Sequence, residues 1–345
     1  MAWGIALLWP SPVSSLFLPF SRTVSRMLAY LFSVLPFSVF EWIVLCLVLW
    51  GLFLLARLIL RLIRAGKRGV ARRSLLARAA ASLTLAVAAT AFCFTFLWGL
   101  NYAAPPLSET FDLPVEPRGE EFLKEATLQL LAQANRLSEQ VPRDGEGRPD
   151  FGTVEQLGRP AIDAFNALAE DNDRFGGASP PVKTMTFWIV PSLLNVAGIY
   201  FPFTGESNVN PDAPDSTLPF TICHEMAHRL GFAPEDEANY VAFLACRASD
   251  LPMFRYAAYL EAFLYCGNAL GDETRREVMQ QAGPPVRADI ALMREHYMKY
   301  EGPLRQIGES INHGYLVMMG QPEGVGSYGM VVDLLLAEYA KEGRL

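Results

Sequence analysis

The side chains best suited to chemistry lie in one short stretch, TICHEMAHRLGFAPEDEANYVAF, at positions 221–243. His224 and His228 are four residues apart, a spacing that puts both imidazoles on one side of a helix. Neutral imidazoles are good zinc ligands, and Glu225 is offset so that it can reach a water without itself binding the metal. The pattern therefore predicts a zinc site in which Glu225 removes a proton from water and a carbonyl is hydrolysed.

The helix that carries these residues has suitable ends. Thr217 or Pro219 can begin it, and Gly231 stands where a glycine commonly ends a helix. An exposed helix with two solvated histidines is the alternative. Apolar neighbours such as Met226 and Leu230 make that alternative the weaker one.

A catalytic zinc site needs a third protein ligand and an open position. Pro234 suits the first turn of a second helix, so Glu235 and Glu237 fall in that turn. A role as partners of the helix dipole would explain their acidity but not their closeness to two histidines. Both glutamates are candidate ligands.

Hydrolysis also needs a hydrogen-bond donor for the oxyanion and a surface that holds the substrate. His313, Tyr315 and Tyr328 are candidate donors, because polar rings on a late segment can fold over a cleft. Each of the three has a structural role as its alternative. The segment GIYFPFTGESNVN, in which Pro202 favours an edge position, is a candidate substrate-binding strand or an ordinary hairpin.

Hydrophobic residues are distributed unevenly over the chain that must position these groups. The chain has 345 residues, of which 51% are hydrophobic, and the excess lies in residues 37–63 and 75–100. Each run exceeds the roughly 20 apolar residues that cross a bilayer, whereas soluble cores seldom contain two such runs. Two transmembrane helices are predicted, with Trp98 and Tyr102 in an interfacial aromatic belt after the second.

The segment between the two runs is basic and contains no acid, which predicts a cytoplasmic loop. Glu41 marks the outer edge of the first span, and Arg57 and Arg61 can snorkel at its other end. The large domain after the second span is then extracytoplasmic. Prolines break residues 1–36, which we interpret as an interfacial or membrane-associated segment without deciding whether it spans.

The expected domains are residues 1–36, the spans at 37–102, a proline-rich linker at 103–119 and a domain at 120–345. Helical periodicity predicts helices over 120–140, 154–171, 222–230, 235–247, 253–270, parts of 287–319, and 328–342. Residues 180–192 and 198–210 are the strand candidates. The predicted class is α+β, a mainly helical domain with a small β-sheet after two transmembrane helices.

Charge and cysteine content exclude other classes. The net charge is −7, and most acids follow residue 109, so the domain lacks the basic face that nucleic-acid binding needs. Five cysteines without close spacing do not form a disulfide scaffold, although one bridge is allowed. The oligomeric state stays open.

Two resemblances follow from these motifs. Glu-x-x-Ala-Asn, at Glu235 and Asn239, resembles the second ligand helix of gluzincin peptidases, which implies Glu235 as ligand and Asn239 as the residue that orients a histidine. The six residues between His228 and Glu235 are closer to metzincin spacing, with Gly231 matching and Pro234 replacing the third histidine. The two apolar runs together with LWGLNYAAPPL, GIYFPFTGESNVN and EGVGSYGMVVDLL resemble a bacterial membrane-protein family known only as a domain of unknown function.

The expected function is that of a zinc metallopeptidase in the bacterial cell membrane, multi-pass and with a zincin-like domain outside. Its expected partners are membrane lipid and a peptide or protein substrate of the cell envelope. A non-catalytic zinc-stabilised binding or assembly protein is one alternative. A hydrolase of non-peptide amides in the cell wall is another.

Overall fold

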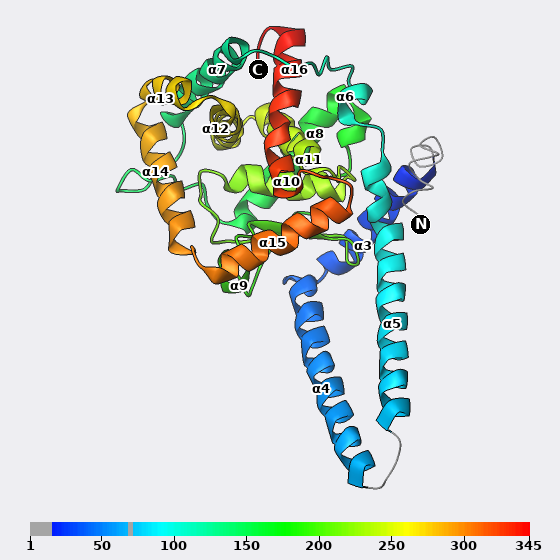
Figure 1. The fold of residues 1–345 in the computed structure, drawn as a ribbon. Helices are drawn as coiled ribbons and strands as arrows, with labels where there is room; N and C mark the ends of the chain where they lie inside the picture. The colour runs from blue at the N-terminus through cyan, green and yellow to red at the C-terminus, as the bar shows by residue number, and fades with distance from the viewer. Residues whose placement is uncertain (1–15, 68–71) are drawn as a thin grey trace.

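The computed structural model describes residues 16–67 and 72–345, and shows a helical domain from one end of which two long helices extend (Figure 1). The elements before the sheet are α3 Leu18–Ser33, α4 Val39–Lys67, α5 Arg72–Leu97, η2 Gly99–Ala103, α6 Leu107–Thr110, α7 Glu120–Ser138, α8 Val154–Asp171 and η3 Asp173–Phe175. The sheet region holds β1 Lys183–Thr184, α9 Ile189–Leu193, β2 Gly198–Phe201 and β3 Glu206–Val209. The remaining elements are α10 Leu218–Arg229, α11 Glu235–Ala248, α12 Pro252–Ala269, α13 Asp272–Gln280, α14 Pro284–Lys299, α15 Pro303–Met318, η4 Gly324–Met330 and α16 Val331–Glu342.

The helices α4 and α5 are the two predicted apolar runs, and both are long and apolar enough to cross a membrane. Their apolar windows are not buried in the protein, which excludes the alternative that they are core helices. Two carboxylates hold the start of α4 against the domain. Glu206 accepts hydrogen bonds from the backbone N–H groups of Val39 and Phe40, and Glu41 accepts them from Thr186 and Phe187.

The segments before and after the two long helices both pack on the domain. In α3, Ser25 bonds to the Tyr200 hydroxyl at 2.8 Å and donates to the carbonyl oxygen of Arg229. In the predicted linker, Leu107 of α6 is fully buried in the domain core. Residues 103–119 are therefore docked at Leu107 and do not form a free tether.

The core lies between α7, α8, α10, α11, α12 and α16, with α10 and α11 packed side by side at its centre. The mainly helical prediction is confirmed, as are helices close to the expected limits. Periodicity missed α13, a short polar helix of which only Val278 is buried. The five cysteines are all free, so the allowed disulfide is not formed.

The sheet has three strands in the order β1-β3-β2, with β1 parallel and β2 antiparallel to β3. The strand prediction for 198–210 is confirmed, and β2 is an edge strand, as Pro202 indicated. The strand predicted over 180–192 is wrong except at Lys183–Thr184, because residues 189–193 form the short helix α9. The apolar residues Ile189 and Val190 of that helix are exposed, so this apolar run did not mark a buried strand.

Candidate metal centre

The helix α10 ends in a turn that its sequence dictates. Gly231 has a φ of +89°, and its N–H bonds to the carbonyl of His228 while the N–H of Phe232 bonds to Ala227. This pair of bonds is the Schellman motif, for which glycine is the best residue. The turn directs the chain back along the end of α10, so that α11 begins beside the histidines.

The same turn orients one of the two imidazoles. Nδ1 of His228 lies 2.8 Å from the carbonyl oxygen of Phe232, which fixes Nδ1 as the protonated nitrogen and leaves Nε2 free to bind a metal. The rings of His224 and His228 lie 4.6 Å apart and almost perpendicular. Both imidazoles therefore belong to one compact group.

Glu235 completes this group from the first turn of α11. Its Oε2 lies 3.3 Å from Nε2 of His224 and 3.5 Å from Nε2 of His228. Burial alone would raise the pKa of Glu235, but the neighbouring histidines lower it to about 2. Burial likewise disfavours charge on His228, yet the Glu235 carboxylate raises the pKa of that histidine to about 9. A negative oxygen and two imidazoles thus face a common point.

Glu225 lies in a tight space between α10 and β2. A Cβ on Gly198 would come within 2.4 Å of its Oε1, so only glycine leaves room for this carboxylate. Burial raises the pKa of Glu225, against the opposing effect of the two histidines, and its Oε2 makes no hydrogen bond within the described chain. Ser207 of β3 donates to the backbone carbonyl of Glu225 at 2.7 Å and holds the helix on the sheet. A buried carboxyl with raised pKa beside the histidines suits proton transfer.

Glu237 points elsewhere. Its Oε1 accepts a 2.6 Å hydrogen bond from the backbone N–H of Leu107, and it is absent from the group of ligand atoms formed by His224, His228 and Glu235. Successive side chains on a helix point in directions about 100° apart, and Glu237 follows Glu235 by two residues on α11. The side chain of Glu237 therefore faces another part of the protein. The structure thus brings Glu235, and not Glu237, to the histidines.

Burial raises the pKa of Glu237 to about 7 from 4.5. Between these values the folded chain keeps a proton that the unfolded chain has lost, so the free energy of unfolding falls as pH rises through this window. We expect Glu237→Gln to remove this loss and to raise the melting temperature at pH 8 much more than at pH 5, by an amount equivalent to about 3 kcal/mol at pH 8. The matched control is Glu295→Gln at an exposed glutamate, which should leave both temperatures unchanged. An equal effect of Glu237→Gln at both pH values would contradict the linkage.

The three candidate donors are placed differently. The hydroxyl of Tyr315 accepts a 3.0 Å hydrogen bond from Nε1 of Trp98. The Trp98 ring stands edge-on to the His228 ring, with their centroids 5.7 Å apart. Burial raises the pKa of Tyr315, and the charge of Glu235 contributes to this rise. His313 is exposed and accepts a bond from the N–H of Val325, because two residues of helix separate it from Tyr315 by about 200°. Tyr328 lies in η4, and its side chain is outside the described part of the chain. Tyr315 is the candidate donor that the fold brings near the site.

Comparison with known proteins gives one match. A family model described as a protein of unknown function, DUF3810, matches residues 19–336, which is most of the chain. The chain belongs to the DUF3810 family. No curated protein and no solved structure matches it. The DUF3810 match covers nearly all of α3, the two long helices and the domain as far as the middle of α16, but supplies no catalytic information.

Sequence reasoning missed several residues of this DUF3810 site. Trp98 was interpreted as an interfacial residue only, and Gly198 carried no signal because its contact with Glu225 is between distant segments. Tyr265 of α12 forms a hydrogen bond with Asn239. Burial raises the pKa of Tyr265, as do the charges of Glu261, which lies one helical turn away on α12, and of Glu235. The spacing of Glu261 and Tyr265 indicates that the two residues share one side of α12, but nothing in the sequence connects that side to α11.

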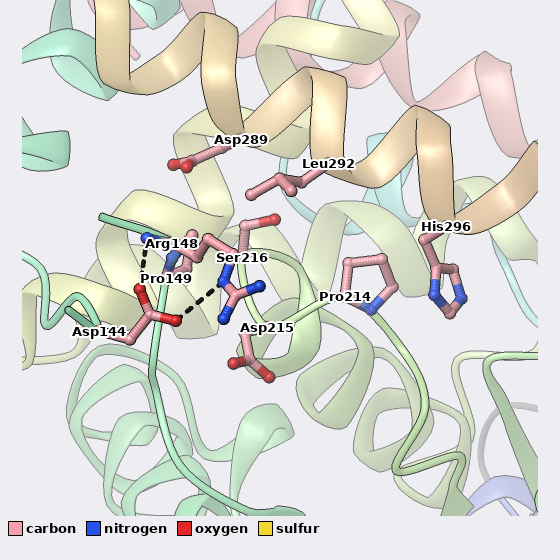
Figure 2. Close-up of a pocket in the computed structure, with 9 residues that line it drawn as sticks. All are labelled: Asp144, Arg148, Pro149, Pro214, Asp215, Ser216, Asp289, Leu292 and His296. Carbon is pink, nitrogen blue, oxygen red and sulfur yellow. Dashed lines mark hydrogen bonds and ion pairs between the residues drawn. The ribbon is translucent and has the colours of Figure 1, made fainter. Parts of the chain in front are cut away.

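A separate hollow of the DUF3810 domain lies at the start of α10, where Pro214, Asp215 and Ser216 face α14 (Figure 2). Asp144 accepts two hydrogen bonds from Arg148 there, and Asp289 is held by Arg143. His296 lines the same hollow, with its Nε2 3.8 Å from Oδ2 of Asp212. Its acids are thus mostly satisfied by arginines, in contrast to the group around Glu235.

Two of the three ligand pairs in this group have the separation that a tetrahedral zinc ion would require. Two ligands about 2.0–2.1 Å from a tetrahedral zinc lie about 3.4 Å apart. The two histidine-to-Glu235 distances are 3.3 and 3.5 Å, and all three ligand atoms lie within 4.8 Å of one another. Oε2 of Glu235 is buried and has no hydrogen-bond partner in the described chain apart from the two imidazoles, which leaves it available to a cation. Two imidazoles and one carboxylate are also a donor set that suits catalytic zinc.

Proposed function

We propose that this chain is a membrane-anchored, zinc-dependent metallopeptidase with a zincin-like domain. The observation that carries the proposal is the convergence of His224, His228 and Glu235, with the buried carboxylate of Glu225 beside them. A purely structural zinc site has no use for a buried, incompletely bonded glutamate next to its ligands, whereas a hydrolytic site needs one.

Each residue has a defined role in this proposal. His224, His228 and Glu235 hold the ion, which when bound would supply Lewis acidity toward a water and a substrate carbonyl. Glu225 takes the proton from the attacking water and passes it to the leaving amine. Tyr315 is the candidate donor to the oxyanion, since its hydroxyl is held by Trp98 beside His228.

The substrate proposed for this site is an extended peptide that adds to β2. In the described sheet β3 pairs with one side of β2 and no strand pairs with the other. Gly198 lies in this strand against Glu225, so a peptide along β2 would pass the proton acceptor. The glycine both makes room for the carboxylate and brings the edge strand close to it.

The membrane topology proposed for the chain follows from its charge. The arginine-rich segment between α4 and α5 favours the cytoplasm, which puts the domain and its site on the other side of the cell membrane. Trp98, directly after α5, contacts His228, so the site lies close to the end of that helix. The proposed substrates are therefore peptides or proteins of the cell envelope.

Replacing Glu225 by glutamine tests the proposed activity. We expect Glu225→Gln to bind zinc as the wild type does and to lose hydrolysis by about 100-fold or more. Purified full-length chains would be compared for zinc content and for cleavage of a mixed-sequence quenched-fluorescent peptide library, and membranes of cells that carry either form would be compared for new protein N-termini.

Equal cleavage profiles for the wild type and Glu225→Gln, with zinc bound in both, would reject hydrolysis. The non-catalytic binding or assembly protein would then be the better interpretation. Cleavage of cell-wall amides but not of peptides by the wild type alone would instead identify the amide hydrolase.

A further inference from the structure

Three helices lie at the end of the domain from which α4 and α5 extend, namely α3, α9 and α15 (Figure 1). Each of them leaves large apolar side chains exposed. Isolated exposed apolar residues are normal, but three helices with exposed apolar faces at one end of a domain need a partner.

The largest of these faces belongs to α15. Leu304, Ile307, Ile311 and Met318 are spaced so that they share one side of the helix, and Ile311 and Met318 are 66% and 68% exposed. The helix packs against the end of α9, because a Cβ on Gly308 would meet the carbonyl oxygen of Leu194, the residue after that helix, at 2.3 Å. Gly308 lies at the edge of the apolar side of α15, and the large apolar side chains of that side stay exposed.

The other two helices continue this face toward the long helices. Met27 and Leu31 of α3 share one exposed side with Val34, the residue after the helix. In α9, Ile189 and Val190 are exposed, and the neighbouring Phe187 stacks edge-on with Trp42 of α4 at 5.6 Å. The apolar faces of α3, α9 and α15, here called the apolar underside, therefore adjoin the start of a candidate span.

The positions of the arginines in α4 and α5 indicate the depth of the apolar underside relative to the membrane. Arg61 follows Glu41 by 20 residues and Trp98 follows Arg78 by 20 residues. At 1.5 Å per residue both intervals are about 30 Å, the thickness of the hydrocarbon core. Arg57, one turn before Arg61, can reach the same boundary by snorkelling. Glu41 and Trp98 are the points at which the two helices join the domain, so the domain end lies at the membrane boundary.

We propose that the apolar underside rests on the lipid bilayer, with the exposed faces of α3, α9 and α15 buried at the boundary between headgroups and acyl chains. Amphipathic helices that lie in this boundary bury their apolar faces roughly 5–10 Å deep. The inference rests on the membrane anchoring proposed above and is independent of hydrolysis. Lipid is the occupant that the continuity with α4 and the two 30 Å intervals support, whereas a second copy of the chain has no such observation.

The test uses the full chain in lipid nanodiscs, with Cys46 and Cys93 replaced by alanine and one new cysteine labelled with an environment-sensitive fluorophore. The sites are Ile311→Cys and Val190→Cys on the apolar underside, Trp50→Cys in the middle of α4, and Glu273→Cys on α13 away from the spans. Each label is measured in nanodiscs that contain lipids with a quencher either near the headgroup or deep in the chain. Monodisperse gel filtration shows that each variant is folded.

The labels at Ile311 and Val190 are expected to emit at shorter wavelength and to be quenched about twofold by the shallow quencher. The label at Trp50 should respond to the deep quencher, and the label at Glu273 to neither. Labels at Ile311 and Val190 that behave like Glu273, while Trp50 is quenched, would overturn the proposal and leave the spans intact. Blue-shifted emission without lipid quenching would also overturn it, in favour of a second copy of the chain on this face. An unquenched Trp50 would remove the membrane anchoring on which it rests, without bearing on hydrolysis.

Discussion

Glu235→Gln is expected to weaken zinc binding by more than about 100-fold, because changes even behind the ligands of a zinc site cost 10–100-fold in affinity. The carboxylate of Glu235 lies 3.3 and 3.5 Å from the two imidazoles and supplies the only negative charge of the ligand group. An amide in its place would leave an ion with two neutral nitrogens and a weak neutral oxygen. Zinc per purified chain, measured by mass spectrometry after dialysis against a chelator, should fall from about one to near zero.

Glu237→Gln is the matched control, since it makes the same chemical change two residues away on α11. It should retain zinc, because the Glu237 carboxylate bonds to Leu107 and is not part of the ligand group. Loss of zinc in Glu237→Gln with retention in Glu235→Gln would show that the ligand assignment is wrong. Loss in both would show that the first turn of α11 as a whole, and not one carboxylate, holds the metal.

Gly198→Ala is expected to lower hydrolysis by about 100-fold or more while the chain still binds zinc. The new methyl group would lie 2.4–2.6 Å from the carboxyl group of Glu225, a separation at which atoms overlap. Glu225 must then leave its place beside the histidines, because the three atoms nearest to the new methyl group all belong to this side chain. Paired measurements of bound zinc and of peptide cleavage separate these two effects.

Gly267→Ala provides the control for a glycine substitution in a buried place. No atom lies within 4 Å of the Cβ it would add in α12, so cleavage and zinc content should both match the wild type. Full cleavage by Gly198→Ala would show that Glu225 is not confined by β2, and would count against its role as the proton acceptor. Loss of zinc in Gly198→Ala would show that the strand supports the ligands as well.

Much of the candidate site was predictable because it is local in the chain. The separation of His224 and His228 by one helical turn, and the glycine turn after them, follow from rules that act over fewer than ten residues. The lengths of the two apolar runs likewise predicted α4 and α5 without tertiary information.

Other features depend on contacts between distant segments. The strand prediction at 187–190 failed because an apolar pattern does not reveal whether a residue faces a core or an exposed surface, and here Ile189 and Val190 are exposed. The prediction of a free linker at residues 103–119 was wrong because Leu107 is buried in the domain core and its N–H donates to the carboxylate of Glu237. Glu237 lies 130 residues further along the chain.

The sequence by itself determined that two histidines and a glutamate share a helix, that a glycine ends it and that two apolar helices precede the domain. Only the tertiary structure placed Glu235, and not Glu237, beside the histidines, since this depends on the angle at which α11 meets α10 and on the hydrogen bond that Leu107 donates to Glu237. It also placed Gly198 against Glu225 and Trp98 against His228. These contacts join segments 27 and 130 residues apart in the sequence, a distance over which neither helical periodicity nor motif spacing carries information.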